Sequence, residues 1–270
     1  MCFSLNLIVS PKNEVVKQTK KLLLVKNRER TGLMILEGVR LIETALQAGI
    51  RFKYFLYSDQ VLKNERGQKL MVYIKNAGLR HNLVTDNIIN EISSTESSQG
   101  ILGVAEKPKV NMNQILVVPN PLILIIDQIR DPGNLGTIIR SADAAGCSGV
   151  ICGKGTVDVT NPKLLRSTMG SIFHLPVVVV DDLREQITDL KKRGIQVIAA
   201  DSRGDYYYHQ LDLKRSTAII LGNEANGISA EILALADKSA KIPILGKAES
   251  LNVAIAASLF VYEAVKQRFS

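Results

Sequence analysis

A run of five aliphatic residues, Leu122 to Ile126, constrains the fold of this chain more than any other feature of its sequence. A strand that is apolar at every position must be buried on both faces, as in a parallel sheet covered by helices on either side. Further strands are expected at residues 149–152, 175–180, 196–200 and 218–221, and helices near 134–145, 161–169, 181–193 and 252–267. This alternation predicts a doubly wound, mostly parallel α/β sheet over residues 121–270.

Residues 1–107 are predicted to form a separate, smaller α/β domain. A helix is expected to begin at Ser10 and Pro11, which offer a capping hydroxyl and a proline at the first helical position. Strands are expected at 33–36, 52–57, 79–84 and 101–105, a helix at 37–48, another ending near 77–78, and a polar loop at 93–100. The segment 108–120, which contains Pro119, is expected to be a linker between the two domains.

The positive charge of the protein lies almost entirely in its first part. Residues 1–110 hold 17 Lys and Arg against 10 Asp and Glu, whereas residues 111–270 hold 17 against 16. A basic first domain indicates a polyanionic partner such as RNA. A solvated basic face without any partner is the alternative interpretation.

Several classes of protein are excluded or disfavoured by what the sequence lacks. No run of about 18 uncharged apolar residues occurs, so no membrane span is expected. The N-terminus has neither a basic stretch nor a small-residue cleavage site, which favours a cytoplasmic location and leaves an organellar one open. The three cysteines, Cys2, Cys147 and Cys152, are too few and too scattered for a disulfide framework or a zinc site.

Nucleotide and metal signatures are also missing. The sequence contains no GxGxxG and no GxxxxGK[ST], which disfavours a dinucleotide-dependent oxidoreductase. Its three histidines, His81, His174 and His209, do not have metal-ligand spacing, so no metal is expected.

Three turn-like segments of the second half carry the residues best suited to chemistry. The first, residues 127–142, follows the apolar strand and brings Asn134, a possible helix cap, and Arg140 two turns later. The second, residues 221–227, holds a lone Glu224 among glycines. The third, residues 242–253, includes Ser250, a plausible N-cap for an alanine-rich helix. Each segment alone is compatible with an ordinary turn.

Together, and in this order, the three segments resemble the signature motifs of the SpoU (TrmH) family of RNA ribose 2′-O-methyltransferases, of the SPOUT class. The resemblance covers roughly residues 120–268, and the first half is similar to the family's accessory substrate-binding domain, which itself resembles small ribosomal proteins. Two residues depart from the family's pattern, since Ala225 stands where glycine is common and Ala254 where serine is common.

The resemblance implies a C-terminal α/β domain with a deep trefoil knot. It also implies S-adenosyl-L-methionine as the methyl donor, an obligate homodimer and an RNA substrate. The residues that would bind the donor are Leu221, Gly222, Ile242 and Leu251. Those that would form the catalytic and RNA-side cluster are Asn134, Arg140, Glu224, Ser250 and Asn252.

The expected reaction is 2′-O-methylation of a ribose in RNA, and the additional basic domain favours ribosomal RNA. A guanidinium is not deprotonated in proteins, so Arg140 is better suited to polarise the 2′-oxygen or clamp a phosphate than to act as a base. Glu224, a phosphate oxygen and water all remain candidates for the proton acceptor. A tRNA methyltransferase and a non-catalytic RNA-binding or ribosome-assembly factor are the alternative functions, and the sequence does not select the modified nucleotide.

Overall fold

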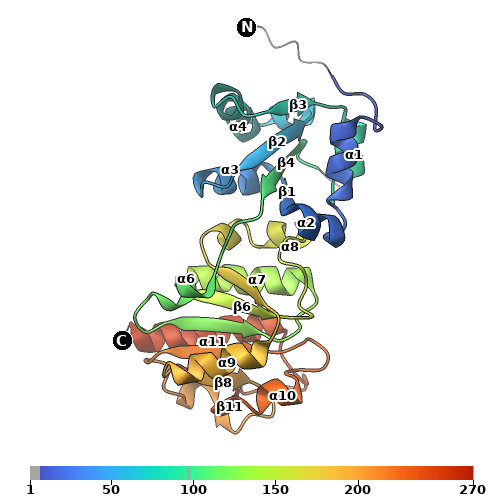
Figure 1. Ribbon diagram of the computed structural model, residues 1–270. Coiled ribbons are helices and arrows are strands. Elements are labelled where there is room, and N and C mark those ends of the chain that lie inside the picture. The colour runs from blue at the N-terminus through green and yellow to red at the C-terminus, as the bar shows by residue number, and fades with distance from the viewer. Residues whose placement is uncertain (1–6, 96–97, 270) are drawn as a thin grey trace. The chain divides into compact units, whose positions relative to one another are not determined.

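The computed structural model describes residues 7–95 and 98–269, and the chain divides into two compact units (Figure 1). Unit 1 comprises residues 1–109 together with 158–173, and unit 2 comprises residues 110–157 together with 174–270. Both units are α/β, which confirms the predicted fold class. Cys2 and residues 96–97 of the expected polar loop lie outside the described residues.

Unit 2 is built on a seven-stranded sheet in the order β7-β6-β5-β10-β8-β11-β9. Its strands are β5 (Leu122–Ile126), β6 (Gly149–Gly153), β7 (Val177–Val180), β8 (Gln196–Ala200), β9 (Tyr206–Tyr207), β10 (Thr217–Leu221) and β11 (Lys238–Lys241). Its helices are α6 (Met112–Leu116), α7 (Pro132–Ala144), α9 (Leu183–Lys192), η3 (Tyr208–Gln210), α10 (Ala230–Leu233) and α11 (Val253–Arg268). Every pairing in this sheet is parallel, as the apolar run in β5 predicted.

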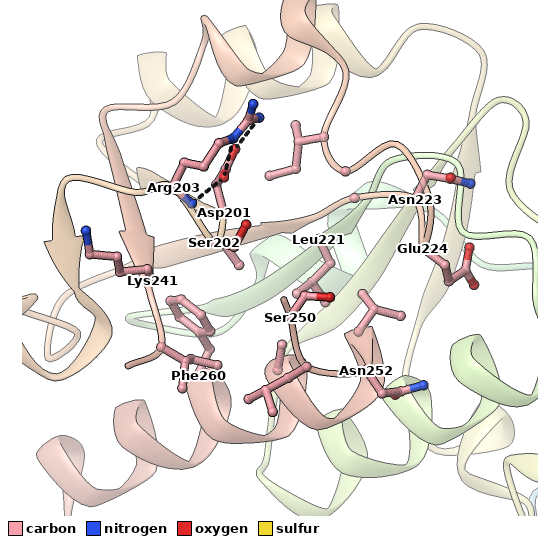
Figure 2. A pocket seen from close by; sticks show the side chains of 18 of the residues that line it. Asp201, Ser202, Arg203, Leu221, Asn223, Glu224, Lys241, Ser250, Asn252 and Phe260 are labelled. Atoms are coloured by element: carbon pink, nitrogen blue, oxygen red, sulfur yellow. Dashed lines mark hydrogen bonds and ion pairs between the residues drawn. The ribbon is translucent and has the colours of Figure 1, made fainter. Parts of the chain in front are cut away.

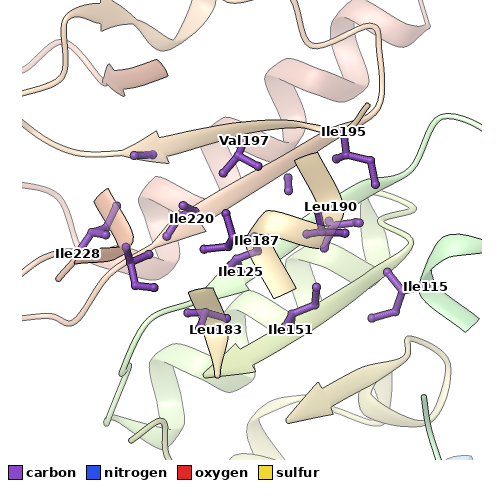
Figure 3. Packing of buried hydrophobic residues seen from close by; sticks show 14 of the residues in the cluster. Ile115, Ile125, Ile151, Leu183, Ile187, Leu190, Ile195, Val197, Ile220 and Ile228 are labelled. Carbon is purple, nitrogen blue, oxygen red and sulfur yellow. The ribbon is translucent and has the colours of Figure 1, made fainter. Parts of the chain in front are cut away.

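The core of unit 2 explains why its central strands are apolar at every position. All five residues of β5 and of β10 are buried, because helices cover both faces of the sheet. On one face, Ile187 and Leu190 of α9 pack against alternate strand residues such as Ile125 and Ile220 (Figure 3). On the other face, α11 packs on α7, β10 and β8.

Unit 1 is built on a four-stranded mixed sheet in the order β1-β4-β2-β3. Its strands are β1 (Leu33–Glu37), β2 (Phe52–Tyr57), β3 (His81–Leu83) and β4 (Ile101–Glu106). Its helices are α1 (Glu14–Lys21), α2 (Val25–Thr31), α3 (Val39–Gln47), η1 (Asp59–Lys63), α4 (Glu65–Asn76), α5 (Asp86–Ile92), α8 (Pro162–Ser167) and η2 (Ser171–Phe173). The central strand β4 is antiparallel to both β1 and β2, whereas β2 and β3 are parallel.

Unit 1 is completed by a segment from the second half of the sequence, residues 158–173, which carries α8. The buried guanidinium of Arg28 donates from Nη2 to Oδ2 of Asp158 at 2.6 Å and from Nη1 to the carbonyl oxygens of Leu22 and Leu23. A second ion pair joins Arg166 Nη1 to Oε2 of the buried Glu37 at 3.0 Å. The predicted division into residues 1–107, 108–120 and 121–270 did not assign residues 158–173 to the first domain, and it stays a prediction.

The expected linker and the first helix differ from their predictions. Residues 112–116 form α6, and Ile115 is fully buried against the core of unit 2, so this part of the linker is structured. The first helix begins at Glu14 with Asn13 as its cap, three residues later than expected. Ser10 instead accepts a hydrogen bond from the backbone of Lys12 in the preceding turn.

No helix within residues 7–95 and 98–269 is long and apolar enough to cross a lipid bilayer.

Candidate active site at the carboxyl ends of the parallel strands

A cavity of about 610 Å³ opens in unit 2 where β8, β10 and β11 end (Figure 2). Open parallel sheets bind their ligands at this edge, because the loops that follow the strands converge there. The walls combine apolar side chains, among them Leu221, Ile242 and Phe260, with the polar backbone of the loop that follows β10. Both the size and this mixed lining suit a nucleoside-sized ligand.

The structure brings the three singled-out segments together in this one cavity. The predicted residues that line it are Asn134, Leu221, Gly222, Glu224, Ile242, Ser250, Leu251 and Asn252. Arg140 is the exception, since it is exposed on α7 and does not line the cavity of its own chain.

Three of the predicted polar residues form a continuous hydrogen-bonded chain. Asn252 Nδ2 donates to Oδ1 of Asn134 at 2.9 Å, and Asn134 Nδ2 donates to Oε1 of Glu224 at 3.0 Å. The beginnings of α11 and α7 and the loop after β10 are therefore fixed relative to one another by side chains at the rim of the cavity.

The carboxylate of Glu224 is held by several donors. Its Oε1 also accepts from the backbone of Asp131 at 3.1 Å, and its Oε2 accepts from the backbone of Arg130 at 3.3 Å. Burial acts to raise the pKa of Glu224, but the hydrogen bonds from Asn134 and the backbone outweigh it, and the pKa lies below its ordinary value. Glu224 is thus an ionised acceptor at neutral pH.

The helix caps differ from those predicted from the sequence. Asp131 caps α7, its Oδ1 accepting from the backbone of Asn134 at 2.8 Å, so the side chain of Asn134 is free to bind Glu224. Asn252 caps α11, its Oδ1 accepting from the backbone of Ala254 at 2.9 Å, whereas Ser250 lies two residues before this cap. The predictions of Asn134 and Ser250 as caps were therefore wrong, although both side chains reach the cavity.

Gly222 is required by the close approach of its own loop. A Cβ atom at this position would lie 2.2 Å from the backbone nitrogen of Ile228 and 2.3 Å from the carbonyl carbon of Gly227. The loop closes through reciprocal backbone hydrogen bonds between Asn223 and Gly227, both 2.9 Å long. This tight closure by itself accounts for the glycine.

Sequence reasoning missed one end of the cavity. Asp201 and Arg203 follow β8 and form an ion pair, and Lys241 ends β11. In Figure 2 these side chains lie at the opposite end from Glu224 and Asn252. The position of Asp201 directly after a predicted strand was an available signal, whereas Lys241 belongs to a strand that the sequence did not reveal.

The part of the chain that the structure describes contains no candidate metal site. No group of three His, Cys, Asp or Glu side chains there is arranged to hold a metal ion. Cys147 and Cys152 are unpaired and buried, and burial raises the pKa of each thiol to about 12, so neither is an active nucleophile.

Comparison with known proteins places this geometry in a family. The SpoU rRNA Methylase family model matches residues 121–262, which is more than half of the chain. The chain belongs to the SpoU rRNA methylase family. Within this SpoU protein, residues 13–103 also match the MRM3-like substrate binding domain, which corresponds to the basic first part of the sequence.

The similarity to individual SpoU proteins extends over nearly the whole chain. The 23S rRNA (guanosine(2553)-2′-O)-methyltransferase RlmP of Bacillus subtilis is 36% identical, with 94% of this chain and 97% of the relative covered. The 23S rRNA (uridine(2479)-2′-O)-methyltransferase of Streptomyces viridochromogenes is 32% identical, with 97% and 93% covered.

A solved structure shows the same fold with a cofactor bound. The SpoU methyltransferase AviRb from Streptomyces viridochromogenes in complex with AdoMet superimposes with a TM-score of 0.86 at 32% identity, covering 96% of this chain and 99% of AviRb. The all-parallel sheet of unit 2 is thus the α/β-knot domain of the SpoU family, preceded by its small mixed-sheet domain.

Proposed function

We propose that this SpoU-family protein transfers a methyl group from S-adenosyl-L-methionine to the 2′-hydroxyl of a ribose in the RNA of the large ribosomal subunit. The observation that carries the proposal is the hydrogen-bonded chain Asn252–Asn134–Glu224 at the rim of a nucleoside-sized cavity. Two relatives that match almost the full length are named for 23S rRNA 2′-O-methylation, which supports the choice of RNA. These two relatives are named for different nucleotides, a guanosine and a uridine, so the experiment below maps which nucleotide this protein methylates.

The cavity fits the adenosyl part of the donor. Leu221, Ile242 and Leu251 offer apolar walls, and the backbone of the loop that begins at Gly222 offers the polar groups that a purine edge requires. When bound, S-adenosyl-L-methionine supplies an activated methyl group and departs as a neutral thioether. The protein therefore has to align the reacting atoms and remove one proton, so orientation contributes most of the rate gain.

Glu224 serves this reaction as a fixed anion that positions Asn134. Its pKa lies below the ordinary value, and a base must have a pKa near the working pH to accept a proton efficiently. Three donors also already occupy its oxygens. The pKa does not choose among the three candidate proton acceptors, since a phosphodiester oxygen and water are weaker bases than a carboxylate, and it is the occupied oxygens that count against Glu224.

Arg140 is proposed to bind the RNA at the reacting ribose, by polarising the 2′-oxygen or by clamping the adjacent phosphate. Its exposed position on α7, outside the cavity of its own chain, leaves it available to a second subunit. We therefore propose that Arg140 acts within a homodimer.

The surface of α11 supports the dimer. Apolar residues occur on every side of this helix, and a helix of this kind is normally buried all round. Ile255 remains 51% exposed and Tyr262 49% exposed in the single chain. An Ile255→Asp variant should be monomeric in analytical ultracentrifugation, whereas Val72→Asp, which alters an equally exposed valine of α4, should leave the dimer intact.

The compartment is proposed to be the cytoplasm, which two unpaired cysteines support because disulfides are rare there.

The test of the reaction uses unmodified 23S rRNA transcribed in vitro, radiolabelled S-adenosyl-L-methionine and mapping of ribose methylation. One methylated nucleotide is expected with the wild-type protein. The Arg140→Ala variant should lose turnover while its affinity for the donor, measured by calorimetry, is kept. Absence of donor uptake by the wild-type protein would instead favour a non-catalytic RNA-binding factor, and methylation of tRNA but not rRNA would change the substrate.

A further inference from the structure

An aromatic cluster next to the cofactor cavity has no part in the reaction described above. It consists of Tyr207, Tyr208 and His209, at the edge strand β9 and the turn that follows it. The His209 ring lies parallel to that of Tyr207, with 5.7 Å between centroids, and meets the Tyr208 ring edge-on at 5.5 Å. Tyr207 is 41% exposed and His209 is also exposed.

Both ends of this cluster touch the wall of the cavity. At one end the Tyr208 ring packs against Phe260, with 5.7 Å between centroids. At the other end Nζ of Lys241 lies 5.5 Å from the centroid of Tyr207. Phe260 and Lys241 both line the cavity, so the exposed rings are continuous with its rim.

The backbone that carries the cluster is anchored by hydrogen bonds and by buried leucines. Leu211 and Leu213, which follow it, are buried, and the side chain of Gln267 on α11 hydrogen-bonds to the backbone of both. The backbone nitrogen of Tyr207 donates to Oε1 of Gln210 at 2.9 Å. An aromatic surface on an anchored backbone loses less conformational entropy than a mobile loop does when a flat ligand stacks on it.

The local charge favours an anionic ligand. Lys238 and Lys241 form no ion pair with any described carboxylate, and each ammonium instead lies over a tyrosine ring. Of the nearby carboxylates, Asp201 pairs with Arg203, whereas Asp205 accepts a hydrogen bond from the neutral hydroxyl of Ser239 and keeps its charge, so the two lysines still outnumber the unpaired carboxylate. Exposed aromatic rings beside lysines that lack a carboxylate partner are typical of surfaces that bind single-stranded nucleic acid.

We propose that Tyr207 and His209 form a stacking surface for an unpaired base of the substrate RNA, at the end of the cavity opposite Glu224. The proposal rests on the proposed function. A stacked base contributes more to binding than a cation–π contact at an exposed site does. A base therefore replaces the Lys241 ammonium on the Tyr207 ring, and the released ammonium pairs with the adjacent phosphate. The RNA strand then extends across the mouth of the cavity, between this surface and the hydrogen-bonded residues Asn252, Asn134 and Glu224.

Tyr206 provides a matched control on the same short strand. Adjacent residues of a strand point to opposite faces, and Tyr206 contacts Lys238 rather than Lys241. It is 43% exposed, close to the value for Tyr207, and like Tyr207 it does not itself line the cavity, but it does not stack on His209.

The experiment measures the affinity for unmodified 23S rRNA transcript by filter binding and the affinity for S-adenosyl-L-methionine by calorimetry. Tyr207→Ala should weaken RNA binding about 5- to 100-fold, while Tyr207→Phe and Tyr206→Ala should leave it unchanged. Donor affinity should be the same in all variants. On the wild-type protein, transcript containing 4-thiouridine should crosslink to the peptide that holds Tyr207 and His209, which tests the surface even if a variant fails to fold.

Unchanged RNA affinity in Tyr207→Ala with no crosslink at this peptide would overturn the proposal. So would a parallel loss of donor affinity, which would make the cluster part of the cofactor site, or dissociation of a dimer, which would make it a subunit interface. Binding is measured without turnover. If the wild-type protein methylates RNA but Tyr207→Ala binds RNA as tightly as the wild type, only this surface is refuted. A protein that binds RNA through Tyr207 without methylating it refutes only the proposed reaction, and one that does not bind the transcript refutes both.

Discussion

Asn252 donates a hydrogen bond from Nδ2 to Oδ1 of Asn134 across 2.9 Å, which joins the N-cap of α11 to the first turn of α7. The two residues are separated by 118 positions in the sequence. Asn134 in turn donates a hydrogen bond from Nδ2 to Glu224. A substitution at any of the three residues therefore changes the hydrogen bonding of the other two.

Replacing Asn134 tests whether these three hydrogen-bonded side chains organise the active site. A hydrogen bond to a charged group contributes about 1.5–3 kcal/mol, so Asn134→Ala is expected to lower kcat/KM for RNA methylation by about 10- to 150-fold. Thr137→Ala, one turn further along α7 on an exposed side chain, is the control and should retain activity. Equal activity of the two variants would remove Asn134 from the machinery.

The charge of Glu224 predicts a pH dependence of stability. Its pKa is lowered in the folded protein, so the ionised carboxylate contributes stability above the unfolded-state pKa of about 4.3, and this contribution is lost as the pH falls through the lower folded-state value. The difference in unfolding free energy between wild type and Glu224→Gln should therefore be constant from pH 8 to about pH 5 and shrink below about pH 4. Urea unfolding over this range measures it.

Glu249→Gln is the control for this measurement, because Glu249 is exposed in the neighbouring loop. A difference that grew with acidity would mean that the pKa of Glu224 is raised rather than lowered, and would restore it as a candidate proton acceptor.

The close approach of backbone atoms to Gly222 predicts that the loop after β10 does not tolerate a side chain there. A Cβ atom there meets backbone rather than a flexible side chain, so Gly222→Ala should destabilise the closed loop by about 1–3 kcal/mol. Calorimetry should show correspondingly weaker binding of S-adenosyl-L-methionine. Gly246→Ala has no atom within 4 Å of the added Cβ and should bind the donor as the wild type does. Normal binding by Gly222→Ala would show that the loop adapts freely.

The ion pair of Arg28 predicts a strong effect on the stability of unit 1. Arg28→Ala leaves Asp158 without its partner in a largely buried setting, which should cost about 3–5 kcal/mol of stability. Arg30→Ala, two positions away on an exposed side chain, should change stability by less than about 0.5 kcal/mol. Thermal unfolding followed by circular dichroism compares them, and a similar melting temperature for both variants would contradict the structural role of Arg28.

The apolar strands of unit 2 could be predicted because their composition is dictated by burial on both faces. β5 and β10 have no exposed residue, and their runs of Leu and Ile leave few alternatives. β11 escaped prediction because it lies near the edge of the sheet and buries only Ala240 of its four residues. Its remaining residues, two lysines and a serine, resemble those of a loop.

The site was predicted as a set of residues but not as a set of interactions. Asp131 and Asn252 compete with Asn134 and Ser250 for the capping positions, and the sequence gives all four residues similar capping ability. Only the structure shows which side chain caps and which is left to line the cavity. The membership of α8 in unit 1 was beyond local reasoning, because the pattern of a helix reveals its buried face but not the core that receives it.

The contribution of residues 158–173 to unit 1 affects the order in which the protein can be made. Domains generally fold as units while the chain is still being synthesised, the N-terminal one first. Here the partners of Arg28 and Glu37 are Asp158 and Arg166, which are translated long after the sheet of unit 1. Unit 1 therefore reaches its final form only once β5, α7 and β6 of unit 2 have left the ribosome, and a transplant of residues 1–109 into another protein would carry an unfinished domain.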